Sequence, residues 1–413
     1  MSRPSAVGLT TGNAPLPDFP QLRTCPYQPP PGYRDLRLTE GPVVRARLYD
    51  GRPTWVVLGH AVARELLIDP RLSSDWGRPD FPSPSPRRKA IQKATMLIGM
   101  DPPEHSAYRR RVIPSFSVRR TRELGESIHR RAGELVDALL AQGPPAEILR
   151  GLALPLSSHT ICAILGVPYE DHAYFEEQSA MLVSSQVSEE DATGALMNLR
   201  DYLTSLVDRK EKEKESEPGE GLLDTLVHKD LADGSLSRDE VIGLGIILLM
   251  AGHETTASMI TLSTFTLLQD PSQLEAFRND PDGAGLAVEE LLRYLSIGDV
   301  AMRIAAEDMT VGDAHIKAGD SVMLSAAEIN RDPEAFEDPD VLDLGRGARH
   351  HLAFGYGVHQ CVGQNLARAQ MQSALTLLFS RIPGLRLAVP AEEVEIKPAQ
   401  SGVQGIYELP VAW

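Results

Sequence analysis

Residues 354–363 read FGYGVHQCVG, and the cysteine in this stretch is Cys361. An apolar helical pattern follows it and predicts a helix from Val362 to Ser380, so Cys361 lies just before a helix N-terminus. The free N–H groups and the positive dipole end at such a position favour an anion. Because the thiolate is the form of cysteine that binds a metal, the stretch predicts Cys361 as a metal ligand.

The glycines of the stretch, Gly355, Gly357 and Gly363, permit backbone conformations and close approaches that a Cβ would prevent. From the residues alone, two other interpretations stay open. Cys361 can be a buried structural thiol, or His359 can be the ligand in its place.

The clearest helix begins at Ser237, where Ser237 and Glu240 form an S-x-x-E capping box, and it ends at Gln269 before an Asp-Pro pair. It would contain about 32 residues and measure roughly 48 Å at ~1.5 Å per residue. Its middle is apolar on every side, which predicts a helix buried through the centre of a large fold. The most apolar run, Val241 to Ala251, is about half of the ~20 residues that a membrane span needs, so no membrane contact is expected.

The first stretch resembles the haem-binding signature of the cytochrome P-450 family, F-G-x-G-x-H-x-C-x-G. Its fixed positions are Phe354, Gly355, Gly357, His359, Cys361 and Gly363. The resemblance covers residues 15 to 413 and is strongest to an actinobacterial subgroup that oxidises bulky natural products and xenobiotics. Tyr356 is a small departure at a variable position. The resemblance implies a mainly α fold with small β-sheets, one domain enclosing haem b (iron protoporphyrin IX), and Cys361 as its iron ligand.

Within the long helix, residues 251–256 read AGHETT, which is similar to the family motif A/G-G-x-D/E-T. We expect Gly252 to leave room for a distal ligand. Thr255 can hydrogen-bond a helix carbonyl and open a groove for dioxygen and water. Glu254 supplies a carboxylate beside it for proton relay. The alternative is a polar interruption that is satisfied inside a buried helix.

The resemblance also assigns four partners to the two haem propionates: His105, Arg109, Arg303 and His359. His105 and Arg109 are spaced i,i+4 and therefore share one face of a short predicted helix. Charge-assisted bonds from arginine are among the stronger ones available for a carboxylate.

Glu290 and Arg293 form an E-x-x-R pair on another predicted helix. From spacing alone this is a surface ion pair of ~0–1 kcal/mol. The resemblance instead implies a buried structural pair that links to the loops before the cysteine.

The implied activity is monooxygenation, usually C–H hydroxylation, of a bulky hydrophobic substrate such as a polyketide, macrolide, statin-like or steroid-like molecule. Dioxygen is the co-substrate. Electrons would come from a ferredoxin and its reductase, because the chain shows no flavin-binding or Cys₄ ferredoxin segment. A basic patch of Arg110, Arg111 and Arg368 is expected to bind the ferredoxin. The alternatives are a peroxide-driven peroxygenase and a haem sensor or binding protein without turnover.

The substrate pocket is expected above the haem. Its expected lining is Gly252, Thr255, residues 297–300, a mobile lid at residues 78–98, the helices near residues 175–200 and the turn around Val403.

Composition sets the remaining expectations. The 413 residues carry a net charge of −16, which argues against nucleic acid as a partner. The three cysteines are widely spaced, with structural roles expected for Cys25 and Cys162, and fit a reducing cytoplasm. One domain spanning residues 1–413 is expected, with an extended N-terminal segment at residues 1–40.

Overall fold

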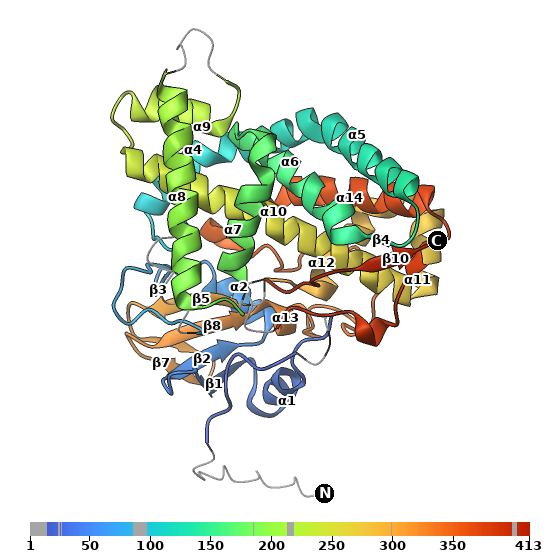
Figure 1. Ribbon diagram of the computed structural model, residues 1–413. Helices are drawn as coiled ribbons and strands as arrows, with labels where there is room; N and C mark the ends of the chain where they lie inside the picture. Colours follow the sequence, from blue (N-terminus) through green and yellow to red (C-terminus); the bar gives the residue numbers. More distant parts are fainter. Residues whose placement is uncertain are drawn as a thin grey trace, which may run out of the picture.

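The computed structural model describes residues 15–23, 25, 27–85, 97–184, 186–212, 219–298, 300–398 and 403–413. Most of these residues are helical. The five-stranded sheet lies below most of the helices in the view of Figure 1, whereas a smaller sheet lies apart from it, near the C-terminus. The prediction of a mainly α fold with small β-sheets is therefore confirmed.

The helices vary from one turn to more than eight. They are α1 (Pro31–Glu40), α2 (His60–Leu66), α4 (Glu104–Val112), α5 (Val118–Gln142), α6 (Leu154–Leu165), α7 (His172–Val183), α8 (Glu189–Lys212), α9 (Leu222–Thr225), α10 (Arg238–Gln269), α11 (Pro271–Asn279), α12 (Ala284–Leu295), α13 (Ala326–Ile329) and α14 (Gln364–Arg381).

The main sheet has five strands in the order β1-β2-β8-β5-β3. They are β1 (Val43–Arg47), β2 (Pro53–Val57), β8 (Ser321–Ser325), β5 (Val300–Ala305) and β3 (Leu72–Ser73). Only the β2–β8 contact is parallel. A turn at Asp50-Gly51 joins β1 to β2, and Gly51 has a φ of +82°.

Two smaller sheets complete the strands. One has the order β4-β10-β9, with β4 (Ala146–Glu147), β10 (Pro410–Ala412) and β9 (Arg386–Leu387), and the other pairs β6 (Met309–Val311) with β7 (Ala314–Ile316).

Helix α10 runs through the centre of the helical part and contacts α6, α8, α12 and α14. Its capping box is present, because the Ser237 side chain accepts from the Glu240 N–H and the Glu240 carboxylate accepts from the Ser237 N–H. The helix is long and apolar enough to cross a membrane, but 78% of its most apolar window is buried inside the fold. The burial of this window identifies α10 as a core helix of the fold.

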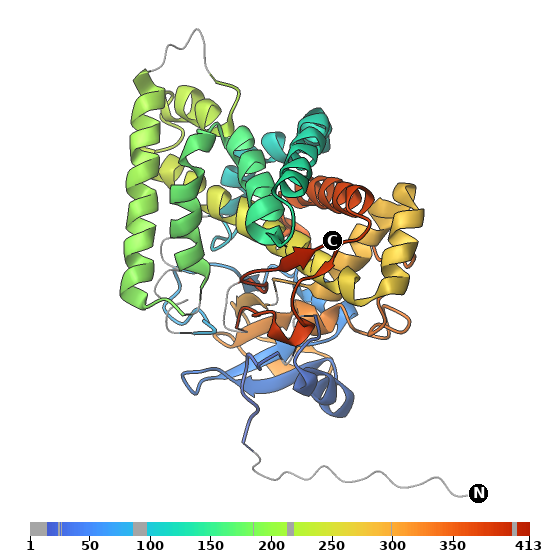
Figure 2. The ribbon, with the colours of Figure 1, turned by 45° about the vertical axis from the view of Figure 1, so that its right-hand side comes forward.

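One expectation about local structure needs correction. Residues 31–40 are not extended but form α1, because a proline fits the first position of a helix and Tyr33 packs against Phe19 under the sheet. The helices expected near residues 175–200 are α7 and α8, which lie side by side (Figure 2). The break occurs where Ser184 becomes extended and Ser188 accepts from the Asp191 N–H at 3.0 Å.

Two of the expected segments lie partly outside the described residues. These are the lid, at residues 86–96, and the N-terminal segment, at residues 1–14, 24 and 26. Residues 78–85 consist of turns and loops, so the lid stays a prediction.

Candidate functional site

The cysteine loop, residues 354–363, ends where α14 begins. The Cys361 N–H donates to the Phe354 carbonyl at 2.8 Å, and the Gly363 N–H hydrogen-bonds the sulfur. Gly355 and Gly357 have φ values of +68° and +74°, which favour glycine. A Cβ on Gly357 would also lie 2.8 Å from the Leu67 carbonyl oxygen. The loop is therefore fixed with its sulfur at the N-terminus of α14.

The environment of Cys361 combines two properties. Burial raises the pKa of the thiol, while the Gly363 N–H and the guanidinium groups of Arg109 and Arg368 lower it. By surface area, however, Cys361 is exposed. A side chain that is surrounded by protein and still accessible must border a space inside the fold.

The face of α10 that carries Thr255 also borders an open space. Ala251 is exposed and Thr255 half-buried, whereas residues 241–249 and 256–267 of the same helix are buried. The Thr255 hydroxyl donates to the Ala251 carbonyl at 2.9 Å. This bond uses the hydroxyl proton and leaves the oxygen lone pairs as acceptors toward the space.

The expectation that Gly252 leaves room for a distal ligand is wrong, because the position of its absent side chain faces α6. A Cβ at this position would lie 2.4 Å from Cδ1 and 3.1 Å from Cβ of Ile161 in α6. The missing side chain therefore permits the close packing of α10 on α6, and does not make room for a ligand. Residue 252 is rotated by ~100° from residue 251 on the helix, which is why the two face different neighbours.

Glu254 is buried and forms an ion pair with Lys397, whose Nζ lies 3.3 Å from Oε2. The two side chains are only 9% and 12% exposed. Sequence reasoning missed Lys397, because it lies 143 residues away in a loop without a motif.

The four residues expected at the propionates lie together; we call them the cationic cluster. The rings of His105 and His359 are 4.1 Å apart between centroids. Burial lowers the pKa of His359 to about 3, with Arg303, His105 and Arg109 acting in the same direction. Burial likewise lowers the pKa of Arg303 to about 10, which Asp101 partly opposes.

Within the part of the chain that the structure describes, Asp101 acts on this cluster without forming an ion pair with it. None of its four members forms an ion pair there, and Nδ1 of His105 is buried without a hydrogen-bond partner. The arginines donate to backbone carbonyls instead, Arg109 to Gln360 at 2.5 Å and Arg303 to Met302 at 2.8 Å. The two arginines make the cluster a buried positive site that is suited to a carboxylate from outside the chain.

Glu290 and Arg293 are fully buried and joined by two bonds of 2.8 Å. Arg293 also donates to the carbonyls of Asn330 and Pro339, both at 2.8 Å. Glu290 accepts from Arg346 at 3.1 Å. The pair thus connects α12 to residues 330–346, which precede the cysteine loop.

A second buried cluster joins the same helix directly to the cysteine loop. Glu289 binds His351 at 3.2 Å and Arg368 at 2.5 Å. The Arg368 guanidinium also lies 4.6 Å from the ring centroid of Phe354. Sequence reasoning missed Glu289 and His351, because only the fold brings them next to Arg368.

These contacts correct the expected basic patch. Arg368 is paired with Glu289, and Arg111 is paired with Asp230 at 2.7 Å. Two of the three predicted charges are therefore neutralised within the protein. Arg110 is exposed and stays a candidate contact for an acidic partner.

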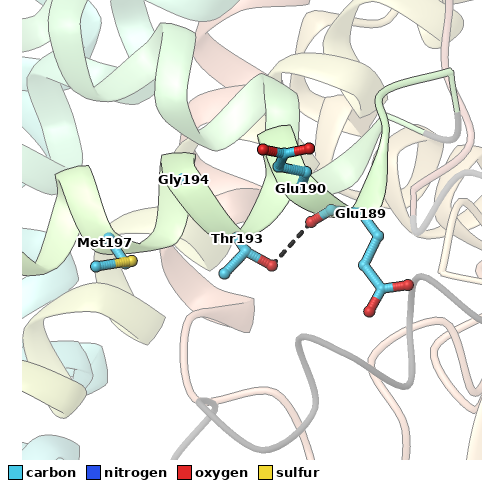
Figure 3. Close-up of a pocket in the computed structure, with 5 residues that line it drawn as sticks. All are labelled: Glu189, Glu190, Thr193, Gly194 and Met197. Atoms are coloured by element: carbon cyan, nitrogen blue, oxygen red, sulfur yellow. Dashed lines mark hydrogen bonds between the residues drawn. The ribbon is translucent and has the colours of Figure 1, made fainter.

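A separate open hollow of about 570 Å³ lies on α8 (Figure 3). It is lined by Glu189, Glu190, Thr193, Gly194 and Met197. The Thr193 hydroxyl donates to the Glu189 carbonyl at 2.8 Å. This hollow falls within the range 175–200 expected along the substrate pocket.

Comparison with known proteins agrees with this arrangement. The profile of the family described as Cytochrome P-450 matches residues 19–284 and 286–401. The chain is 51% identical over 405 residues to cytochrome P-450-SOY of Streptomyces griseus, covering 98% of this chain and 96% of the relative. It is 51% identical over 406 residues to pentalenic acid synthase of Streptomyces avermitilis, covering 98% and 99%.

A solved structure gives the same result for the fold. The mycinamicin VIII C21 methyl hydroxylase of Micromonospora griseorubida, bound to mycinamicin VIII, is 39% identical and superposes with a TM-score of 0.90. The alignment covers 96% of this chain and 100% of that one. The chain therefore belongs to the cytochrome P-450 family of monooxygenases.

Proposed function

We propose that this monooxygenase uses a haem b ligated by Cys361 to hydroxylate a bulky hydrophobic natural product, with electrons from a ferredoxin and its reductase. One observation carries the proposal. The Cys361 thiol is accessible inside the fold at the N-terminus of α14. Arg109, a member of the cationic cluster, lowers the pKa of the same thiol through its charge.

The residues present fit such a haem. Cysteine binds iron as the thiolate. Burial raises the pKa of Cys361 above its ordinary value, and the Gly363 N–H and two arginines near the sulfur partly offset this effect by favouring the thiolate. The two propionates require polar donors, and the orphaned Nδ1 of His105 lies in a cluster whose members form no ion pair with a described carboxylate. The macrocycle requires an open space, and Cys361 and Ala251 both border one.

When bound, the haem supplies the iron at which dioxygen is activated, and a thiolate ligand favours cleavage of the O–O bond. The protein performs the remaining tasks. Cys361 holds the iron, the cationic cluster holds the propionates, and the buried residues of α10 keep bulk water away. Thr255 offers acceptor lone pairs toward the open space, and the neighbouring Glu254 holds or releases a proton.

The substrate class is inferred from the relatives and from the composition of the site. One relative is named for pentalenic acid and another holds mycinamicin VIII. In this chain the accessible face of α10 presents the small side chain of Ala251 beside Thr255, which leaves room for a bulky apolar molecule. A cytoplasmic location is part of the proposal, supported by the burial of α10 and the unpaired thiols.

The first test is spectroscopic. The reduced protein with a full haem load is expected to absorb near ~450 nm under carbon monoxide, and Cys361→Ala is expected to lose this band. Absence of the band in the unmodified protein contradicts Cys361 ligation.

The second test concerns turnover. A panel of macrolactones, sesquiterpene acids and sterols is titrated, and the compound with the largest spin-state shift becomes the probe substrate. NADPH with a surrogate ferredoxin and reductase is expected to give hydroxylated product only when dioxygen is present. Product from hydrogen peroxide alone at an equal rate indicates a peroxygenase, and ligand spectra without product indicate a sensor.

A further inference from the structure

The side chain that faces Glu254 is that of Lys397, from a segment near the C-terminus. Lys397 belongs to what we call the C-terminal hairpin, residues 396–398 and 403–406, in which Ile396 pairs with Ile406. The Lys397 N–H donates to the Gly405 carbonyl at 2.9 Å, so the backbone at the lysine is fixed.

The hairpin is fitted closely against α10 and its surroundings. A Cβ on Gly405 would lie 2.9 Å from Oγ of Ser258, one helical turn after Glu254. The Gln404 N–H donates to the Ile297 carbonyl at 2.9 Å. Because Glu254 and Ser258 share one face of α10, the hairpin contacts this face at two successive turns and directs Lys397 at the carboxylate.

The ion pair compensates the burial of the Glu254 carboxylate. A buried carboxylate without a partner is unfavourable, and it becomes neutral or turns toward water. Lys397 Nζ at 3.3 Å supplies a compensating charge and a hydrogen bond. Within the described part of the chain Glu254 has no other ion-pair partner.

We propose that Lys397 is a positioning residue for proton delivery, holding the Glu254 carboxylate in place beside Thr255. The inference rests on the proposed function. Monooxygenation takes up two protons and two electrons per dioxygen and releases one oxygen atom as water. The electrons come from the redox partner. Glu254 takes each proton from solvent, gives it up on the Thr255 side, and returns as a carboxylate to Lys397.

The experiment compares Lys397→Met, Lys397→Arg, Glu254→Gln and the double variant Lys397→Met/Glu254→Gln. For the probe substrate we measure product formed per NADPH, peroxide released, kcat and KM. Positioned proton transfer contributes ~10²–10⁴-fold to a rate, and loss of position alone removes part of it, so Lys397→Met is expected to lower kcat about tenfold. KM is expected to stay unchanged, peroxide to rise, and Lys397→Arg to restore most of the coupling.

Two controls separate positioning from general destabilisation. Lys210 forms a comparably buried pair with Asp224 at 2.5 Å that involves neither Glu254 nor Lys397, so Lys210→Met is expected to lower stability without changing peroxide release. Urea midpoints of the four cycle members give a readout independent of turnover. The effects of Lys397→Met and Glu254→Gln on stability are expected to be non-additive.

The outcomes distinguish this inference from the proposed function. If Glu254→Gln releases peroxide and Lys397→Met does not, the positioning role is overturned and the proton relay stands. If neither variant uncouples, both the relay and the inference fail. The inference is also overturned if Lys210→Met uncouples as strongly as Lys397→Met. It is likewise overturned if adding Lys397→Met to Glu254→Gln lowers the product formed per NADPH further.

Discussion

Substituting alanine for Gly252 tests directly whether this glycine serves packing or the ligand site. The new Cβ would lie 2.4 Å from Cδ1, 2.5 Å from Cγ1 and 3.1 Å from Cβ of Ile161. Carbon atoms pack best at ~3.5–4.0 Å, so both helices must adjust. The end of the isoleucine can rotate away, but its Cβ is fixed by the backbone of α6. The contact therefore cannot be relieved by a rotamer change alone.

The expected magnitude is the difference of two terms. Overpacking in a core costs ~1–3 kcal/mol. Replacing glycine by alanine inside a helix contributes ~0.8–1.0 kcal/mol of stability through helix propensity. Gly252→Ala is thus expected to lower the free energy of unfolding by about 0–2 kcal/mol. A Cβ on Gly125 in α5 would meet nothing within 4 Å, so Gly125→Ala is expected to raise stability by ~0.8–1.0 kcal/mol.

The assay is equilibrium unfolding in urea at equal haem occupancy, with midpoints compared at a common slope. Ile161→Ala alone is expected to cost ~2–5 kcal/mol. In the Gly252→Ala background the same change removes the overlap, so the double variant should be more stable than the sum predicts by ~0.5–3 kcal/mol. If Gly252→Ala stabilises the protein as much as Gly125→Ala, the packing argument is refuted. If it alters only the affinity for distal ligands, the original interpretation from the sequence was correct.

Three other substitutions follow from contacts described above. Arg293→Ala leaves Glu290 buried with fewer partners and is expected to lower the free energy of unfolding, measured in urea, by ~3–5 kcal/mol. The exposed Arg119→Ala is the control and is expected to cause no measurable change. A loss below ~1 kcal/mol for Arg293→Ala contradicts the buried-pair argument. Burial alone would raise the pKa of Glu289, but hydrogen bonds from His351 and Arg368 hold it at about 2. Because this pKa is depressed, the pair contributes stability above the ordinary value of 4.5 that is lost as pH falls toward 2, and Glu289→Gln should flatten the pH dependence of the urea midpoint in that range. Thr255→Ala removes the acceptor oxygen and is expected to divert electrons from product to peroxide, and unchanged coupling would exclude its assigned role.

The features predicted best from the sequence are those determined by neighbouring residues. The limits of α10 agree with expectation because the capping box of Ser237 and Glu240 and the stop at Asp270 are local. The loop before α14 is also local, since its glycines and Cys361 are consecutive in the chain. By contrast, the Pro-rich N-terminal segment looked extended throughout, although a proline is compatible with the first turn of α1.

The partners of charged residues could not be predicted in the same way. Arg111 and Arg368 looked like free surface charges, because nothing near them in the sequence indicates Asp230 or Glu289. Lys397 is another example, since its contact with Glu254 depends on how the C-terminal hairpin packs on α10. Long-range pairing is a property of the tertiary fold and leaves no periodic signal.

The motif in α10 shows why consecutive residues carry unrelated constraints. Each step along a helix turns by ~100°, so neighbouring side chains meet different parts of the protein. Ala251 and Thr255 border the open space, while the absent side chain of Gly252 faces Ile161. His253 packs 5.5 Å from the ring of Phe175 in α7, and its Nδ1 donates to a helix carbonyl.

Glu254 then turns toward Lys397 on yet another side. One helical turn thus fixes α10 against α6, α7 and the C-terminal hairpin, while Ala251 and Thr255 face the open space. An insertion of one residue before Gly252 would rotate the later side chains by ~100° and place each against the wrong neighbour. The motif is therefore contiguous because three packing contacts set the rotation at which Thr255 faces the open space.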